Sequence, residues 1–229
     1  MTAVSNVVFL LDVDNTLLDN DRVIADLREH LQSKFGSASA GRYWSIFEAL
    51  RTELGYADYL GALQRYRVDT ELNLNGDPRL LEMSGFLIDY RFADVLYPGS
   101  LAVIERLNAF GPTVVLSDGD AVFQPRKVLC SGIGDAVEGR VLIYIHKEEM
   151  LDQMRRHFPA RHYVMVEDKL RILAAMKAVL GDTLTTVFVR QGHYALDPAV
   201  LANYPPADFS FERIGDLLSA DIASWLPPA

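Results

Sequence analysis

The chain has very little cysteine. Its 229 residues include only Cys130, so no intramolecular disulfide and no cysteine-rich metal site can form within it. Scarce cysteine is usual for proteins kept in a reducing compartment, and we expect a cytoplasmic location. Cys130 lies in an apolar helical segment, which favours a core position over a role as a nucleophile.

Positive charge is also scarce. The chain has 22 Lys and Arg against 31 Asp and Glu, a formal net charge of -9, and no basic run. Neither nucleic acid nor an anionic membrane surface is therefore an expected partner. An acidic protein still binds a small anionic substrate where a metal ion and a lysine offset the charge locally. We expect a small-molecule partner, and the sequence leaves the number of subunits open.

Long hydrophobic runs are missing from the start of the chain. The apolar run at residues 7–11 stops at Asp12, and no positively charged segment precedes it. It is too short for a signal peptide or a membrane span, so neither is expected.

What the chain does have is a pattern of strands and helices. The apolar, partly β-branched run at 7–11 is typical of a strand buried on both faces. After residue 97, apolar segments alternate with single helical segments. Strands are expected at 113–117, 141–145, 162–167, 185–189 and, for a short one, 208–211. This alternation predicts an α/β fold, with a Rossmann-like parallel sheet and helices on both faces.

A different pattern fills the region between the first two strands. Residues 19–93 contain no convincing strand, and their apolar residues recur at helical spacing. Each helix is amphipathic, so it can bury its apolar face only against the others. We therefore predict an α/β core of residues 1–18 and 94–229, and an inserted helical domain of residues 19–93. The small residues at 36–41 are expected to form a connection.

Polar residues follow several predicted strands. Asp12 and Asp14 close the first, Ser117 the second and Asp168 the fourth, while Lys147 follows the third. The carboxyl ends of parallel strands lie at one edge of a sheet, where ligands bind. These side chains are therefore expected to lie close together.

Asp12 and Asp14 are the most informative pair. While the strand persists, both lie on one of its sides. Two carboxylates about 4 Å apart repel by roughly 4 kcal/mol at an effective dielectric near 20, so they need a cation or a proton. The alternative is that Asp14, Asn15 and Thr16 form only a turn that caps the next helix.

Four segments resemble the motifs of the haloacid dehalogenase superfamily. The sequence Asp-Val-Asp-Asn-Thr-Leu-Leu at 12–18 resembles its first motif, and Leu-Ser-Asp-Gly at 116–119 its second. Lys147 lies where the lysine of the third is expected, and Val-Met-Val-Glu-Asp at 164–168 resembles the fourth. The helical insertion falls where this superfamily has its cap domain, so the resemblance covers almost the whole chain.

The resemblance implies a magnesium-dependent phosphatase that acts on a small phosphorylated metabolite. Asp12 would be the nucleophile and form an aspartyl phosphate. Asp14 would protonate the leaving alcohol and then deprotonate the attacking water. Lys147 would offset the negative charge of Asp12 and of the phosphoryl group.

The resemblance also implies binding roles. Ser117 and the backbone amides of Asp118 and Gly119, with Lys147, would hold the phosphoryl oxygens. The side chains of Asp12 and Asp168 and the main-chain carbonyl of Asp14 would bind Mg²⁺. The fourth motif departs from the usual pattern, because Glu167 replaces a small residue and no acid follows at 170–173. Glu167 is therefore a further possible metal ligand.

Three alternatives stay open. A 2-haloacid dehalogenase would also use Asp12, but it would need neither a metal nor Asp14. A non-catalytic binding protein on the same scaffold would fit the missing acid. Lys127 is the rival to Lys147 as the basic residue of the site, although its place within a helix favours the surface.

Overall fold

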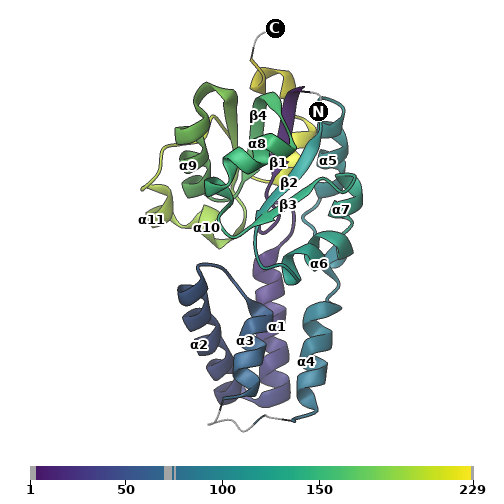
Figure 1. The fold of residues 1–229 in the computed structure, drawn as a ribbon, viewed down its shortest axis with the longest axis vertical. Helices are drawn as coiled ribbons and strands as arrows, with labels where there is room; N and C mark the ends of the chain where they lie inside the picture. Colours follow the sequence, from purple (N-terminus) through teal and green to yellow (C-terminus); the bar gives the residue numbers. More distant parts are fainter. Residues whose placement is uncertain (1–3, 70–73, 75, 228–229) are drawn as a thin grey trace.

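The computed structural model describes residues 4–69, 74 and 76–227, and its centre is a six-stranded parallel sheet in the order β3-β2-β1-β4-β5-β6. Figure 1 shows this sheet in one part of the molecule and a group of helices in the other. The α/β prediction is confirmed. The strands are β1 (Ser5–Leu11), β2 (Thr113–Asp118), β3 (Val141–Tyr144), β4 (Ala160–Glu167), β5 (Leu184–Val189) and β6 (Phe209–Phe211).

The strand order reverses at β1. The chain runs from β1 outward to β2 and β3, then returns to the other side of β1 and continues through β4, β5 and β6. Such a reversal opens a crevice at the carboxyl ends of the two central strands. The crevice lies between the ends of β1 and β4, so the residues after these strands are the ones best placed to bind a ligand.

Both faces of the sheet are covered, as the apolar run in β1 predicts. Phe9 and Leu11 pack with Ile104 and other residues of one apolar cluster, while Val8 and Leu10 pack with Met176 in a second. The first cluster includes residues of α5 (Ser100–Asn108), α6 (Phe123–Cys130) and α7 (Ile133–Ala136). The second includes residues of α8 (Leu151–His157), α9 (Leu170–Leu180), α10 (Gly192–Leu196) and α11 (Pro198–Leu201).

The segment between β1 and β2 is mainly helical, with α1 (Asn20–Phe35), α2 (Ser37–Leu54), α3 (Tyr59–Arg67) and α4 (Arg79–Ile88). Tyr43 and Tyr66 are fully buried among these helices, with their rings edge to face at 5.6 Å. We call α1–α4 the helical unit. Within the described residues, no helix has both the length and the apolar character to cross a membrane.

Two local predictions were wrong. The expected connection at 36–41 is reduced to Gly36, whose φ of 80° ends α1, and α2 begins at the next residue. Gly36 alone supplies the left-handed conformation that the change of direction needs. Cys130 is exposed, because α6 buries its other side, through Phe123 and Val128.

Candidate active site

Three carboxylates from the two central strands meet at the carboxyl edge of the sheet. Leu11 pairs with Val166, and the N–H of Asp12 donates to the carbonyl oxygen of Val166 at 3.1 Å. This register places Asp12 beside Glu167 and Asp168. One oxygen from each of the three lies within 4.8 Å of the others, and none of the three residues is more than 2% exposed.

Lys147 lies between two of these carboxylates. It begins a short 3₁₀ helix after β3, and its Nζ is 2.5 Å from Asp12 Oδ1 and 2.6 Å from Glu167 Oε2. The same ammonium donates to the carbonyl oxygen of Leu116 at 3.2 Å. Burial opposes its charge, but Asp12 and Glu167 outweigh burial and raise the pKa of Lys147. Lys147 is therefore cationic at neutral pH.

One lysine does not satisfy three buried acids. Asp12 Oδ2 and both side-chain oxygens of Asp168 are buried without a hydrogen-bond partner among the described residues. Burial raises the pKa of Asp168 well above its ordinary value, and Glu167 adds to the rise against the opposing charge of Lys169. Burial also opposes ionisation of Asp12, but Lys147 and Lys169 hold its pKa below the ordinary value. The unpartnered oxygens are hard donors, so they fit a divalent cation such as Mg²⁺.

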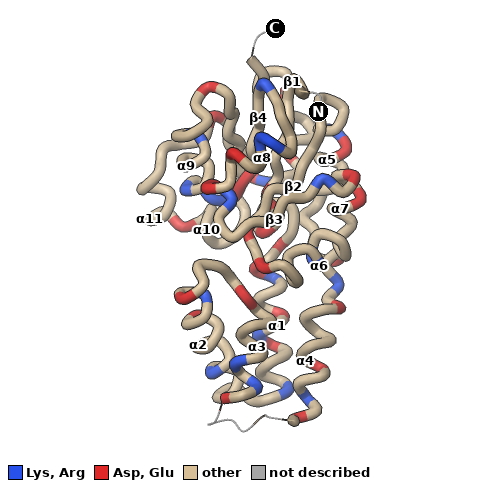
Figure 2. The backbone as a smooth tube through the Cα atoms, viewed as in Figure 1, with Lys and Arg blue, Asp and Glu red and all other residues tan. Residues whose placement is uncertain are grey.

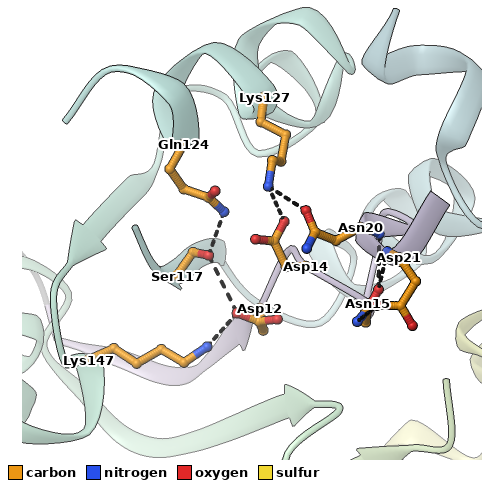
Figure 3. Close-up of polar contacts among 9 residues, drawn as sticks. All are labelled: Asp12, Asp14, Asn15, Asn20, Asp21, Ser117, Gln124, Lys127 and Lys147. Carbon is orange, nitrogen blue, oxygen red and sulfur yellow. Dashed lines mark hydrogen bonds and ion pairs between the residues drawn. The ribbon is translucent and has the colours of Figure 1, made fainter. Parts of the chain in front are cut away.

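A polar chain leads from Asp12 to α6. Ser117, at 1% exposed, donates from Oγ to Asp12 Oδ1 at 3.4 Å, and Gln124 Nε2 donates to Ser117 Oγ at 3.0 Å (Figure 3). Gly119 allows this approach, because a Cβ there would lie 2.6 Å from Cβ of Gln124. The chain fixes the rotamer of Ser117, whose hydroxyl faces the nucleophile candidate.

One part of the expected phosphoryl site has another partner. The N–H of Gly119 donates to the carbonyl oxygen of Tyr144 at 2.9 Å, so it is not free to bind a phosphoryl oxygen in this conformation. The side chain of Asp118 has a partner as well, since its Oδ1 accepts from the N–H of Lys147 at 2.7 Å. Of the expected phosphoryl-binding groups, the side chains of Ser117 and Lys147 are the ones that reach Asp12.

Lys127 is not a surface residue, so that expectation was wrong. Its side chain is 1% exposed, and its Nζ donates to Asp14 Oδ1 at 2.7 Å and to Asn20 Oδ1 at 2.9 Å (Figure 3). The Nζ also lies 5.2 Å from the centre of the Phe123 ring. The structure therefore places both lysines at the site, Lys147 against Asp12 and Lys127 against Asp14.

The turn after β1 also caps the start of the helix that follows, α1. Asn15 has a φ of 62°, and its Oδ1 accepts hydrogen bonds from the N–H groups of Asn20 and Asp21 at the start of α1. The turn interpretation and the active-site interpretation of residues 14–16 therefore describe the same segment.

A cleft of about 880 Å³ lies between the sheet edge and the helical unit. Asp14, Lys127 and Lys169 line it from the sheet side, and Trp44 and Arg51 line it from the helical unit. Figure 2 shows acidic and basic residues interspersed in both parts of the molecule. Individual pairs of acidic and basic residues, and not an extended surface of like charge, therefore set the charge that a ligand in the cleft meets.

Comparison with known proteins identifies the family. A family model described as haloacid dehalogenase-like hydrolase matches residues 7–179. The chain belongs to the haloacid dehalogenase-like hydrolases. Membership agrees with the motifs found in the sequence, and it makes the protein a hydrolase.

Solved structures of other haloacid dehalogenase-like hydrolases are similar over nearly the full length. One from Burkholderia xenovorans is 63% identical, with a TM-score of 0.89 over 98% of this chain and 100% of its own. L-2-haloacid dehalogenase from Xanthobacter autotrophicus is 19% identical, with a TM-score of 0.60 over 92% and 96% of the two chains. A magnesium-bound hydrolase from Bacillus subtilis is 14% identical, with a TM-score of 0.55 over 94% and 98%. The last two structures show the shared fold. Among curated protein sequences, none gives a significant match.

Two residues of this hydrolase's site were not singled out from the sequence. Gln124 carries no motif signal, because only the packing of α6 against β2 brings it to Ser117. The sequence does offer a signal for Lys169, because this residue directly follows Asp168. Burial opposes its charge, but Asp168, Glu167 and Asp12 raise the pKa of Lys169, so it is a second cation beside the carboxylates.

Asp118 gives this hydrolase a pH-dependent stability. Burial raises the pKa of Asp118 from 3.8 to about 6, with Lys147 opposing the rise and Asp12 adding to it. The folded state therefore binds this proton more tightly than the unfolded chain does. Stability falls as pH rises from about 4 to about 6, and the cost persists above that range.

We expect Asp118→Asn to raise the free energy of unfolding by about 2 kcal/mol at pH 7.5 and to change it little at pH 4. Asparagine keeps an oxygen that accepts from the N–H of Lys147, so the local geometry is retained. Urea denaturation of both proteins at the two pH values measures the difference. A gain of equal size at both pH values would contradict the explanation.

Proposed function

We propose that this hydrolase is a magnesium-dependent phosphatase that acts on a small-molecule phosphate ester. The observation that carries the proposal is the set of unpartnered oxygens on Asp12 and Asp168, buried at the reversal point of the sheet. Buried carboxylates without a counter-charge are costly, whereas a bound divalent cation compensates them. The proposed partner is a small molecule, with neither nucleic acid nor membrane involved.

The nucleophile of the proposed reaction is Asp12. One of its oxygens attacks phosphorus, the ester P–O bond breaks, and an aspartyl phosphate forms. Lys147, 2.5 Å from Oδ1, stabilises negative charge as the phosphoryl group approaches. Ser117 Oγ is held by Gln124 on the same side, which orients it toward a phosphoryl oxygen.

Asp14 is the proposed acid and base. Its Oδ1 is held by Lys127, and its side chain is 24% exposed at the cleft wall, which leaves Oδ2 available to a ligand. In the first step Asp14 protonates the departing alkoxide. In the second it removes a proton from the water that attacks the phosphoryl group, and this releases phosphate and restores Asp12.

The side chains of Asp12 and Asp168 and the main-chain carbonyl of Asp14 would hold the magnesium ion, with Glu167 as a further candidate ligand. When bound, the ion supplies Lewis-acid polarisation of the phosphoryl group and balances the buried acids. The helical unit would act as the cap of residues 19–93 and limit water in the cleft during the reaction.

A 2-haloacid dehalogenase is the second candidate. Lys147 and Lys169 both lower the pKa of Asp12 against the effect of burial, so they keep the carboxylate ionised without a metal ion. A dehalogenase needs such a carboxylate, and it needs neither Mg²⁺ nor an acid at position 14. Asp14, held in the cleft wall by Lys127, has a role only in the phosphatase.

The test compares the two reactions in one preparation. With p-nitrophenyl phosphate, we expect turnover in millimolar Mg²⁺ and at least a 100-fold loss after chelation with EDTA, with recovery when Mg²⁺ is restored. With 2-chloropropionate, we expect no chloride release in either condition. Chloride release that is insensitive to EDTA would contradict the phosphatase proposal and support the dehalogenase.

Binding and turnover assays with a wider set of esters test the alternative of a non-catalytic binding protein. Binding of Mg²⁺ or of phosphate without turnover, across a panel of sugar phosphates, nucleotides and short-chain phosphate esters, would identify a non-catalytic binding protein and contradict the proposal.

A further inference from the structure

The side chain of Lys169 lines the cleft. Its Nζ lies 5.3 Å from the centre of the Tyr194 ring, and among the described residues no side chain forms a hydrogen bond or an ion pair with it. An ammonium ion that is mostly withdrawn from water loses hydration, and only an anionic ligand or water can replace it.

A second cation contacts the same tyrosine from the helical unit. Arg51 of α2 donates from Nη2 to Tyr194 Oη at 2.8 Å, and its side chain is 46% exposed. Its nearest acid is Glu48, with Oε2 3.7 Å from Nη1, which is too long for a hydrogen bond. Arg51 thus keeps guanidinium donors for a ligand in the cleft.

The charges of the site show why Lys169 is free for another task. With a divalent cation bound, Lys147 and that cation together would balance the carboxylates of Asp12, Glu167 and Asp168. Lys127 pairs with Asp14. Lys169 is left over, and it makes no direct contact with the carboxylate of Asp12, where the phosphoryl group is transferred.

We propose that Lys169 and Arg51, which both contact the side chain of Tyr194, bind a second anionic group on the alcohol part of the substrate. The substrate class is then a phosphomonoester whose leaving group carries a carboxylate or a second phosphate. The inference rests on the proposed phosphatase function and narrows its substrate. A charge-assisted contact from two cations gives both affinity and orientation to the leaving group.

The experiment uses three esters with the same two-carbon chain. 2-Hydroxyethyl phosphate is the reference, because its leaving alcohol is uncharged. The leaving alcohol of 2-phosphoglycolate carries a carboxylate, and that of ethylene glycol bisphosphate carries a second phosphate. We expect kcat/KM to favour at least one anionic ester over the reference by about tenfold or more. Lys169→Met should reduce that preference about tenfold, mainly through KM, and Lys169→Arg should retain most of it.

Lys177→Met is the matched control. Lys177 lies on α9, the helix that Lys169 directly precedes, but its Nζ contacts Asp208 and the carbonyl oxygen of Leu184, away from the cleft. The variant Lys177→Met should keep the wild-type preference for the anionic ester. As a readout without turnover, calorimetry on Asp12→Asn protein should show weaker binding of the preferred ester after Lys169→Met is added.

The outcomes separate the two proposals. No phosphate release from any ester, with wild-type protein and Mg²⁺, contradicts the phosphatase function itself. Release without preference for an anionic ester overturns the inference. A loss of equal size for all three esters in Lys169→Met also overturns it, because Lys169 would then bind the transferred phosphoryl group.

Discussion

Asp12→Asn is expected to abolish phosphate-ester hydrolysis, with kcat lower by about 10⁴-fold or more, while the fold is kept. The amide oxygen is a poor nucleophile, so no acyl phosphate forms. Asparagine has nearly the shape of aspartate, so the packing around this position is retained. Lys147 keeps its ion pair with Glu167 in the variant.

Two measurements check this prediction beyond loss of rate. Acid quenching of wild-type protein during turnover should trap a phosphorylated species that hydroxylamine cleaves, and Asp12→Asn should give none. Single turnover in ¹⁸O-labelled water should place the label in phosphate, because water attacks phosphorus. Label in the carboxylate of Asp12 would instead indicate that water attacks the acyl carbon of the intermediate, which is the position attacked in the alkyl ester of a dehalogenase.

The matched control is Asp152→Asn, which changes an exposed carboxylate on α8. It should hydrolyse p-nitrophenyl phosphate at the wild-type rate. Asp12→Asn protein that retained more than a tenth of wild-type kcat would exclude Asp12 as the nucleophile.

Lys147→Met is expected to lower the free energy of unfolding by about 3–5 kcal/mol, because it leaves Asp12 and Glu167 buried without their shared cation. Both carboxylates are almost completely buried, so water does not replace the ammonium. The loss should shrink at lower pH, as the two acids of the folded variant take up protons. Urea denaturation at pH 7.5 and pH 5 measures both effects.

The same substitution at Lys127 is the control. Both lysines are about 1% exposed, but the partner of Lys127, Asp14, is 24% exposed and can be hydrated when the cation is removed. We therefore expect Lys127→Met to cost about 1–2 kcal/mol, less than Lys147→Met.

A double variant separates stability from activity. Adding Glu167→Gln to Lys147→Met removes one of the two buried carboxylates that have lost their shared cation, so it should recover part of the lost stability. It should not recover hydrolysis, since the cation beside Asp12 is still missing. Equal costs for Lys147→Met and Lys127→Met would contradict the role assigned to burial.

The fold was predictable because its signals are local. The apolar run in β1, the alternation of strands and single helices after residue 97, and the long helical segment each depend on neighbours in sequence. Boundaries were less predictable where one residue decides them. Gly36 alone ends α1, whereas the small residues after it are compatible with a helix as well as with a loop.

The grouping of Asp12, Ser117, Lys147 and Asp168 was predictable for a topological reason. In a parallel sheet every strand delivers the residue after its carboxyl end to the same edge, whatever the side chains are. The structure brings these four residues together as expected. The catalytic and metal-binding roles proposed for them rest on the chemistry of the groups and on the experiments above.

By itself, the sequence determined the α/β fold, the family and the edge of the sheet where the carboxylates meet. Only the tertiary structure decided what each cation meets: Lys147 lies at Asp12 and Glu167, Lys127 at Asp14, and Lys169 beside the ring of Tyr194. Lys127 and Gln124 lie on α6, and the side that this helix turns toward β1 depends on packing with residues more than a hundred positions away. The periodicity of a helix shows which residues share a side, but only the packed fold shows what that side contacts.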